Sequence, residues 1–187
     1  MRNTTNTQLN GVAIRSYCGL DHAAVRHLYR AGLLLGYIDP RDTAADLDDI
    51  ESHYLSQPGS HFWVAETHGY VIGTIAVADV GANAQVAQIR RLRVESAWRS
   101  SPLSAELLHT AIEYCRRHGY IKVVLDTHLD SDEARSLLEA CGFMHARSRP
   151  ASGKLRLEFY TDLYHHPHRH EDESQTRQMT NDGMLTD

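Results

Sequence analysis

A short polar segment, Arg99 to Ser104, contains residue types that bind phosphate groups: one arginine and three serines. Arginine forms charge-assisted hydrogen bonds to phosphate oxygens, and serine hydroxyls can donate further ones. Ser101 followed by Pro102 is also typical of a helix start, because serine caps free N–H groups and proline is tolerated at the first helical position. A helix start presents those N–H groups and the positive end of the helix dipole, which together can hold a diphosphate. Taken alone, the segment is equally well explained as a capped helix.

Three arginines, Arg90, Arg91 and Arg93, lie just before this segment. Guanidinium groups can hold a carboxylate or a phosphate in bidentate fashion. An exposed charged face explains the cluster equally well. These residues are therefore candidates for contacts with an anionic ligand.

In the strand that carries the arginines, the alternation of apolar and polar residues changes phase partway along. Ala87 and Ile89 share one phase of the alternation, whereas Leu92 and Val94 share the other. A β-bulge inserts one residue, produces such a change, and leaves backbone groups that a ligand can use. A strand that ends early is the alternative, and we expect the bulge.

Hydrophobic periodicity predicts the elements that position these residues. Strands are expected at 12–17, 61–66, 70–79, 121–127 and 155–159, and helices near Asp21, Thr43, Ser101 and Asp130. The runs FWVA and VIGTIAVA indicate strands buried on both faces, which requires helices above and below the sheet. The sequence therefore predicts an α/β sandwich. One group of acidic residues is expected to form a solvated helix face: Asp46, Asp48, Asp49 and Glu51.

Length and composition favour one domain. The chain has 187 residues, a net charge of -5 and a pI near 6.2, which argues against a general nucleic-acid binder. Three scattered cysteines fit a reducing cytoplasm better than a disulfide framework, and the longest apolar tract is too short to span a membrane. We expect a domain at 11–164, with disordered ends at 1–10 and 165–187.

Four histidines lie close together in the polar C-terminal tail: His165, His166, His168 and His170. Neutral imidazoles could capture a transition metal there. A flexible tail does not enforce a coordination geometry. No metal site is predicted.

Two motifs resemble those of the GCN5-related N-acetyltransferase (GNAT) superfamily. The segment RSSPLS aligns with R/Q-x-x-G-x-G/A, with Pro102 and Ser104 in place of the glycines. The second motif, N-x-x-A-x-x-L-Y-E-x-x-G-F, is matched by Ser131, Ala134, Leu137, Leu138, Glu139, Gly142 and Phe143. With FWVAE and VVLDT, the chain over 12–164 looks most like the camello-like branch, which includes cysteine-conjugate acetyltransferases. The resemblance implies a mixed, mostly antiparallel central sheet flanked by helices on both faces, with a bulged fourth strand and a splayed coenzyme cleft.

The resemblance also implies acetyl-CoA as cosubstrate. The residues expected to contact it are Leu92, Arg93, Val94, Arg99, Ser100, Ser101, Pro102, Leu103, Ser104, Ser131, Ala134 and Leu138. The Val94 N–H would polarise the acetyl carbonyl. Gln88 and Leu138 stand where the family often has a catalytic glutamate and a tyrosine, so His128 or Glu66 is the candidate base.

The implied acceptor is the amine of a small molecule, contacted by Tyr37, Arg91 and Thr127, and the protein is expected to be a monomer or homodimer. Neither nucleic acid nor membrane is an expected partner. A second hypothesis stays open, because Pro102, Leu138 and Gln88 depart from the family pattern. On that hypothesis the chain is a non-catalytic acyl-CoA-binding or interaction module on the same fold.

Overall fold

The computed structural model describes residue 9 and the ranges 11–31, 42–80, 85–127, 132–151 and 154–164. Tyr37, His128 and Ser131 lie outside these residues, as do most of the predicted terminal segments. The domain boundaries remain predictions. Where the chain is described, no helix is long and apolar enough to cross a membrane.

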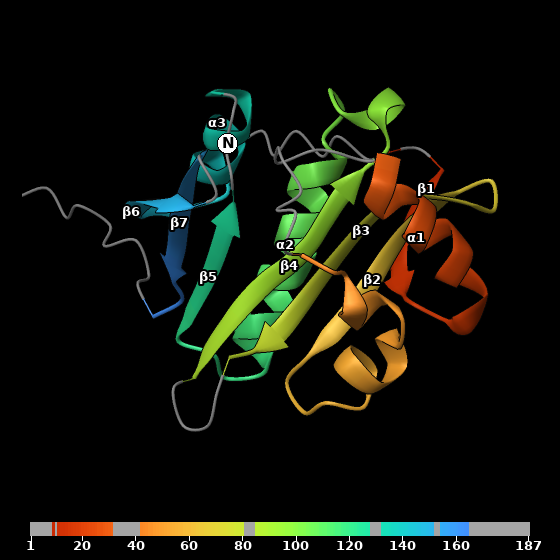
Figure 1. Ribbon diagram of the computed structural model, residues 1–187, viewed down its shortest axis with the longest axis horizontal. Helices are drawn as coiled ribbons and strands as arrows, with labels where there is room; N and C mark the ends of the chain where they lie inside the picture. Colours follow the sequence, from red (N-terminus) through yellow and green to blue (C-terminus); the bar gives the residue numbers. More distant parts are fainter. Residues whose placement is uncertain are drawn as a thin grey trace, which may run out of the picture.

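A seven-stranded sheet with the order β1-β2-β3-β4-β5-β7-β6 organises the chain (Figure 1). Its strands are β1 (Val12–Ser16), β2 (His61–Thr67), β3 (Tyr70–Asp79), β4 (Val86–Val94), β5 (Lys122–Thr127), β6 (Met144–Ala151) and β7 (Lys154–Asp162). Neighbouring strands are antiparallel except for β4 and β5, which are parallel. The predicted mixed, mostly antiparallel sheet is thus confirmed.

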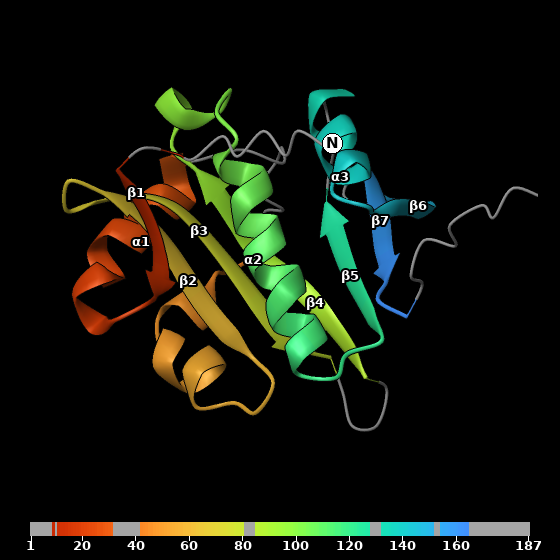
Figure 2. The same ribbon diagram turned by 180° about the vertical axis from the view of Figure 1, so that it is seen from behind.

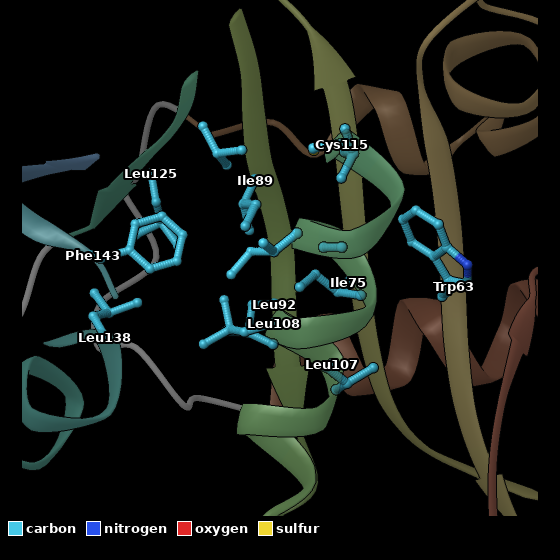
Figure 3. Packing of buried hydrophobic residues seen from close by; sticks show 14 of the residues in the cluster. Trp63, Ile75, Ile89, Leu92, Leu107, Leu108, Cys115, Leu125, Leu138 and Phe143 are labelled. Carbon is cyan, nitrogen blue, oxygen red and sulfur yellow. The ribbon is translucent and has the colours of Figure 1, made fainter. Parts of the chain in front are cut away.

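Helices α2 (Leu103–Arg117) and α3 (Asp132–Ala140) pack on one face of the sheet (Figure 2). Leu108 of α2 lies beside Leu92 of β4, as Figure 3 shows, and Leu107 packs toward Gly73 of β3. The α2 stripe follows the predicted 3.6-residue spacing, and the helix ends before Gly119, whose φ is +76°. This layer is the larger core.

On the opposite face, the described helices and turns cover β2, β3 and the last part of β4. Helix α1 (His22–Ala31) and the short turns η2 (Ala45–Leu47) and η3 (Glu51–Leu55) bury a second cluster against these strands. Residues Ile72 to Ala78 of β3 are all buried, which confirms the predicted burial on both faces. No described helix covers this face of β5, of β7 and of the first part of β4, where Gln88, Asp126 and Glu158 are only partly buried (Figure 1). We call this region the open face.

One local prediction is corrected, one helix start is described in more detail, and one strand was missed. The helix expected near Thr43 is instead a 3-10 turn followed by a π-helical turn, because Ala44 has a left-handed φ of +52°. The first helical turn is the 3-10 turn η1 (Gly19–Asp21), which begins after Cys18. Asp21 completes its capping box by accepting from the Cys18 N–H at 2.9 Å. Strand β6 was missed, because its exposed polar residues lack an apolar alternation.

Candidate active site

The predicted β-bulge lies at Arg91. Thr74 pairs with Arg93 and Ala76 pairs with Arg90, so two residues of β4 oppose one residue of β3. Arg91 has a left-handed φ of +55°, and its carbonyl accepts a hydrogen bond of 2.7 Å from the Thr74 hydroxyl. The extra residue lets both phases of the strand bury their apolar side chains on the α2 face.

Strands β4 and β5 begin to separate just before the bulge. Their ladder runs from Val86 opposite Lys122 to Ile89 opposite Leu125 and has no further pairs. Beyond that point the described residues of β5 continue to pair with β7, and Figure 1 shows β4 and β5 diverging. Among the strands that the structure describes, none therefore lies beside this edge of β4 after Ile89.

The Val94 N–H points to this free edge. Glu95 follows Val94 and donates its N–H to the carbonyl of Ile72 on β3 at 2.9 Å. Successive N–H groups of a strand point to opposite sides, so the Val94 N–H is directed toward the gap between β4 and β5. The Val94 N–H therefore points in the direction that its predicted role as a hydrogen-bond donor to a ligand requires.

The start of α2 offers further donors. The Ser101 hydroxyl oxygen accepts from the Leu103 N–H at 3.3 Å, and the Pro102 carbonyl accepts from the Glu106 N–H at 3.1 Å. Within the described part of the chain, the N–H groups of Ser104 and Ala105 have no acceptor. The Ser104 side chain is only 3% exposed, and its hydroxyl also lacks a partner. An unsatisfied buried polar group is destabilising, so a ligand oxygen at this turn would relieve that cost.

Arg91 does not form the exposed charged face. Its guanidinium donates to Asp42 at 2.6 Å and to Asp46 at 2.8 Å, and the Tyr54 hydroxyl donates to Asp46 as well. Burial alone would raise the pKa of Asp46, but the hydrogen bonds from Arg91 and Tyr54 lower it below its usual value. The solvated position expected for Asp46 is wrong. These four residues form the Arg91 cluster, and the predicted contact of Arg91 with an acceptor remains untested.

Arg93 lies on the same face as Arg91. Its guanidinium carbon is 5.4 Å from the centre of the Tyr29 ring, and one of its terminal nitrogens donates to the Leu92 carbonyl at 2.8 Å. The buried Nε has no hydrogen-bond partner. Burial lowers the pKa of Arg93, and the neighbouring charge of Arg91 acts in the same direction.

A second polar cluster spans the open face where β4 and β5 separate. Arg90 Nε donates to Gln88 Oε1 at 2.7 Å, and Gln88 Nε2 donates to Asp126 Oδ2 at 3.2 Å. Arg156 Nη2 donates to the same oxygen of Asp126 at 2.5 Å. We call these four residues the Asp126 cluster. Sequence reasoning missed Asp126, although its phase in VVLDT, opposite to Val123 and Leu125, indicates a polar-facing position.

The other candidate residues fall into four groups. Leu92, Leu103, Ala134 and Leu138 are buried in the α2 face, where Leu138 packs beside Phe143 and Leu125 (Figure 3). Thr127 is buried at the end of β5 and shares the phase of Leu125, so it faces the α2 layer rather than the open face. Glu66 is not brought to the site, because it lies on β2 and accepts from Arg15 at 2.8 Å. Arg99, Ser100 and Ser101 precede α2, as predicted.

Comparison with known proteins gives consistent matches. The model of the acetyltransferase (GNAT) family matches residues 22–143. N-acetylaspartate synthetase of Mus musculus is 33% identical over 122 residues, which are 65% of this chain and 40% of that protein. N-acetyltransferase 8 of Mus musculus is 40% identical over 101 residues, which are 52% of this chain and 44% of that protein. The chain thus spans less than half the length of these curated relatives.

Solved structures show the same fold. An acetyltransferase from Streptococcus agalactiae superposes with a TM-score of 0.70 at 19% identity, covering 82% of this chain and 99% of that chain. A GCN5-related N-acetyltransferase from Kribbella flavida gives a TM-score of 0.66 at 21% identity, covering 82% of this chain and 98% of that chain. At these identities the likeness concerns the fold alone.

Proposed function

The chain belongs to the acetyltransferase (GNAT) family, and from this premise we propose that it transfers an acetyl group from acetyl-CoA to the amine of a small molecule. One observation carries the proposal. Past Ile89, the free edge of β4 directs the Val94 N–H into the gap beside β5. A backbone N–H fixed in this way can stabilise a developing oxyanion without reorganising during the reaction.

The start of α2 fits the diphosphate of the cosubstrate. Ser104 presents an N–H and a buried hydroxyl, and Ala105 presents an N–H; no described residue accepts from any of these three groups. They lie at the positive end of a 15-residue helix, which favours an anion. Pro102 has a φ of -70°, which is ordinary for proline, so the turn forms without the glycine of the family pattern.

Acetyl-CoA supplies an activated thioester, and the chain's residues would position and polarise it. The Val94 N–H would donate to the carbonyl oxygen while the neutral amine attacks the carbonyl carbon. Leu138 is completely buried and cannot protonate the departing sulfur. A thiol has a pKa of about 8.5, so its thiolate is a fair leaving group that water can protonate.

The acceptor would lie on the open face and carry an anionic group beside its amine. Arg90 is exposed there, and Arg93 on the same face has no carboxylate partner among the described side chains. Guanidinium groups suit carboxylates, which fits the acid named in the relative N-acetylaspartate synthetase. The proposal is therefore an amine of the amino-acid class.

Turnover and binding together test the proposal. The purified chain is mixed with acetyl-CoA and a panel of amines, half of them with a carboxylate, while thiol release is followed. We expect release above the buffer rate, fastest with an amino acid. Calorimetry with acetyl-CoA separates the remaining cases, because binding without turnover would favour the non-catalytic module. Absence of binding at millimolar coenzyme would contradict both.

A further inference from the structure

Asp126 occupies a particular point of the open face. It follows Leu125, the last residue of β5 that pairs with β4, and it pairs across β7 with Glu158. Its side chain is 24% exposed and has the phase of the uncovered face. The carboxylate therefore stands where β4 and β5 begin to separate, on the side proposed for the acceptor.

The carboxylate is held through one oxygen only. Gln88 Nε2 and Arg156 Nη2 both donate to Oδ2. No residue in the described ranges donates to Oδ1. A carboxylate oxygen can accept two hydrogen bonds, so this side of Asp126 retains its full capacity for a donor.

Arg90 fixes the orientation of Gln88. A guanidinium only donates, so the Gln88 oxygen must face Arg90 Nε at 2.7 Å. The amide nitrogen of Gln88 must then face Asp126, as its 3.2 Å contact shows. Gln88 is therefore a donor on this side and offers nothing to a positively charged amine. Within the Asp126 cluster, the group that can accept a hydrogen bond from an ammonium group is therefore the carboxylate of Asp126.

We infer that Asp126 is the residue that binds the ammonium group of the acceptor and receives its proton, a role that rests on the proposed function. Oδ1 would accept from the ammonium, take one proton and pass it to solvent, which leaves a neutral amine. The amine nitrogen then bonds to the acetyl carbon, the carbon–sulfur bond breaks, and the amine loses a second proton. The departing thiolate gains one proton from water. One proton is thus released for each ammonium acetylated.

The matched pair Asp126→Asn and Arg156→Gln tests this role. Asp126→Asn removes the charge that binds the amine, whereas Arg156→Gln removes the partner on Oδ2 and leaves the carboxylate in place. We expect Asp126→Asn to raise the acceptor KM about 10- to 100-fold, the range for losing a hydrogen bond to a charged group. Asp126→Glu should recover part of that loss. Arg156→Gln should raise the acceptor KM much less than Asp126→Asn does, because the carboxylate that binds the ammonium group remains.

Calorimetry with acetyl-CoA and thermal unfolding are the control measurements. Both should be the same for Asp126→Asn and wild type, since Asp126 lies outside the proposed diphosphate site. An unchanged acceptor KM in Asp126→Asn would overturn the inference and leave the proposed function standing. Equal losses in Asp126→Asn and Arg156→Gln would also overturn it, because they would indicate that the ion pair alone matters. A wild-type protein that acetylates no amine would refute both proposals.

Discussion

Two clusters of arginine and aspartate lie on the same face of the sheet, and they differ in how completely their polar groups are used. In the Arg91 cluster, one guanidinium binds two carboxylates, and a tyrosine hydroxyl binds one of them. Its charged side chains are only 13% to 32% exposed. In the Asp126 cluster, both donors to the carboxylate converge on one oxygen, and Arg156 is 42% exposed.

The difference separates a structural ion pair from a candidate binding site. The Arg91 cluster joins the 42–46 segment to the bulge of β4, and so it holds the strand whose far end carries Val94. Charges in such a cluster must stay paired, because a single buried charge is costly. The Asp126 cluster keeps unused hydrogen-bonding capacity in a place that solvent reaches. A residue that binds a ligand needs both an unused hydrogen-bonding group and access to solvent.

The largest effect is expected from Arg91→Met. It leaves Asp42 and Asp46 partly buried without their positive partner, so the free energy of unfolding should fall by about 3 kcal/mol at pH 7. Denaturant titration measures the change. Arg91→Lys keeps the charge but loses the bidentate geometry, so its free energy of unfolding should lie between those of wild type and Arg91→Met. A loss below about 0.5 kcal/mol would be typical of a surface ion pair. It would contradict the claim that the Arg91 cluster is structural and differs in this from the Asp126 cluster.

The stability lost in Arg91→Met should depend on pH, which gives a second test that the Arg91 cluster is a structural group of ion pairs. Burial would raise the pKa of Asp42 and of Asp46, but the hydrogen bonds from Arg91 overcome this and lower both. Groups with lowered folded pKa values stabilise the protein above their unfolded pKa, near 3.9, and lose this contribution as the pH falls through the folded value. The difference between wild type and Arg91→Met should therefore shrink as the pH is lowered from 7 to below the unfolded pKa of these carboxyl groups. A constant difference from pH 7 to pH 3 would contradict the assignment.

Ser104→Ala removes a buried hydroxyl that has no hydrogen-bond partner, whereas Arg91→Met removes a guanidinium group that has several. Removing a buried hydroxyl without a partner should raise the free energy of unfolding by about 1 kcal/mol in the absence of coenzyme. It should also weaken acetyl-CoA binding several-fold, which calorimetry would measure. The control is Thr110→Ala on the same helix, whose hydroxyl donates to the Glu106 carbonyl at 2.8 Å. Equal effects of the two variants on coenzyme binding would show that Ser104 has no special role.

The smallest stability effect is expected from Arg156→Gln. Its ion pair with Asp126 is partly exposed, so the free energy of unfolding should stay within about 0.5 kcal/mol of wild type. Denaturant titration under the conditions used for Arg91→Met gives the direct comparison. A loss as large as that of Arg91→Met would make the Asp126 cluster structural too.

Much of the frame follows from local patterns. The phase change between Ile89 and Leu92 predicted the bulge, and the apolar stripe of α2 predicted the larger core. The turn that joins β2 to β3 is also local, since His68 and Gly69 have left-handed φ values of +49° and +80°. Each of these signals lies within about a dozen residues.

The site chemistry depends on contacts that local patterns do not contain. The pairing of Arg91 with Asp46 joins residues 45 positions apart, and it requires the left-handed backbone at Arg91. The contact of Gln88 with Asp126 requires the register in which Ile89 lies opposite Leu125. The distance of Glu66 from the gap also depends on the order of the strands, which places β3 between β2 and β4.

A structure of the protein with an unreactive acetyl-CoA analogue and an amino acid tests the central claim most directly. The account predicts the analogue in the gap between β4 and β5, with its carbonyl oxygen about 3 Å from the Val94 nitrogen. The diphosphate should contact Ser104 and Ala105, and the amine should lie against Oδ1 of Asp126. An analogue bound elsewhere, or a carbonyl directed away from Val94, would contradict the account.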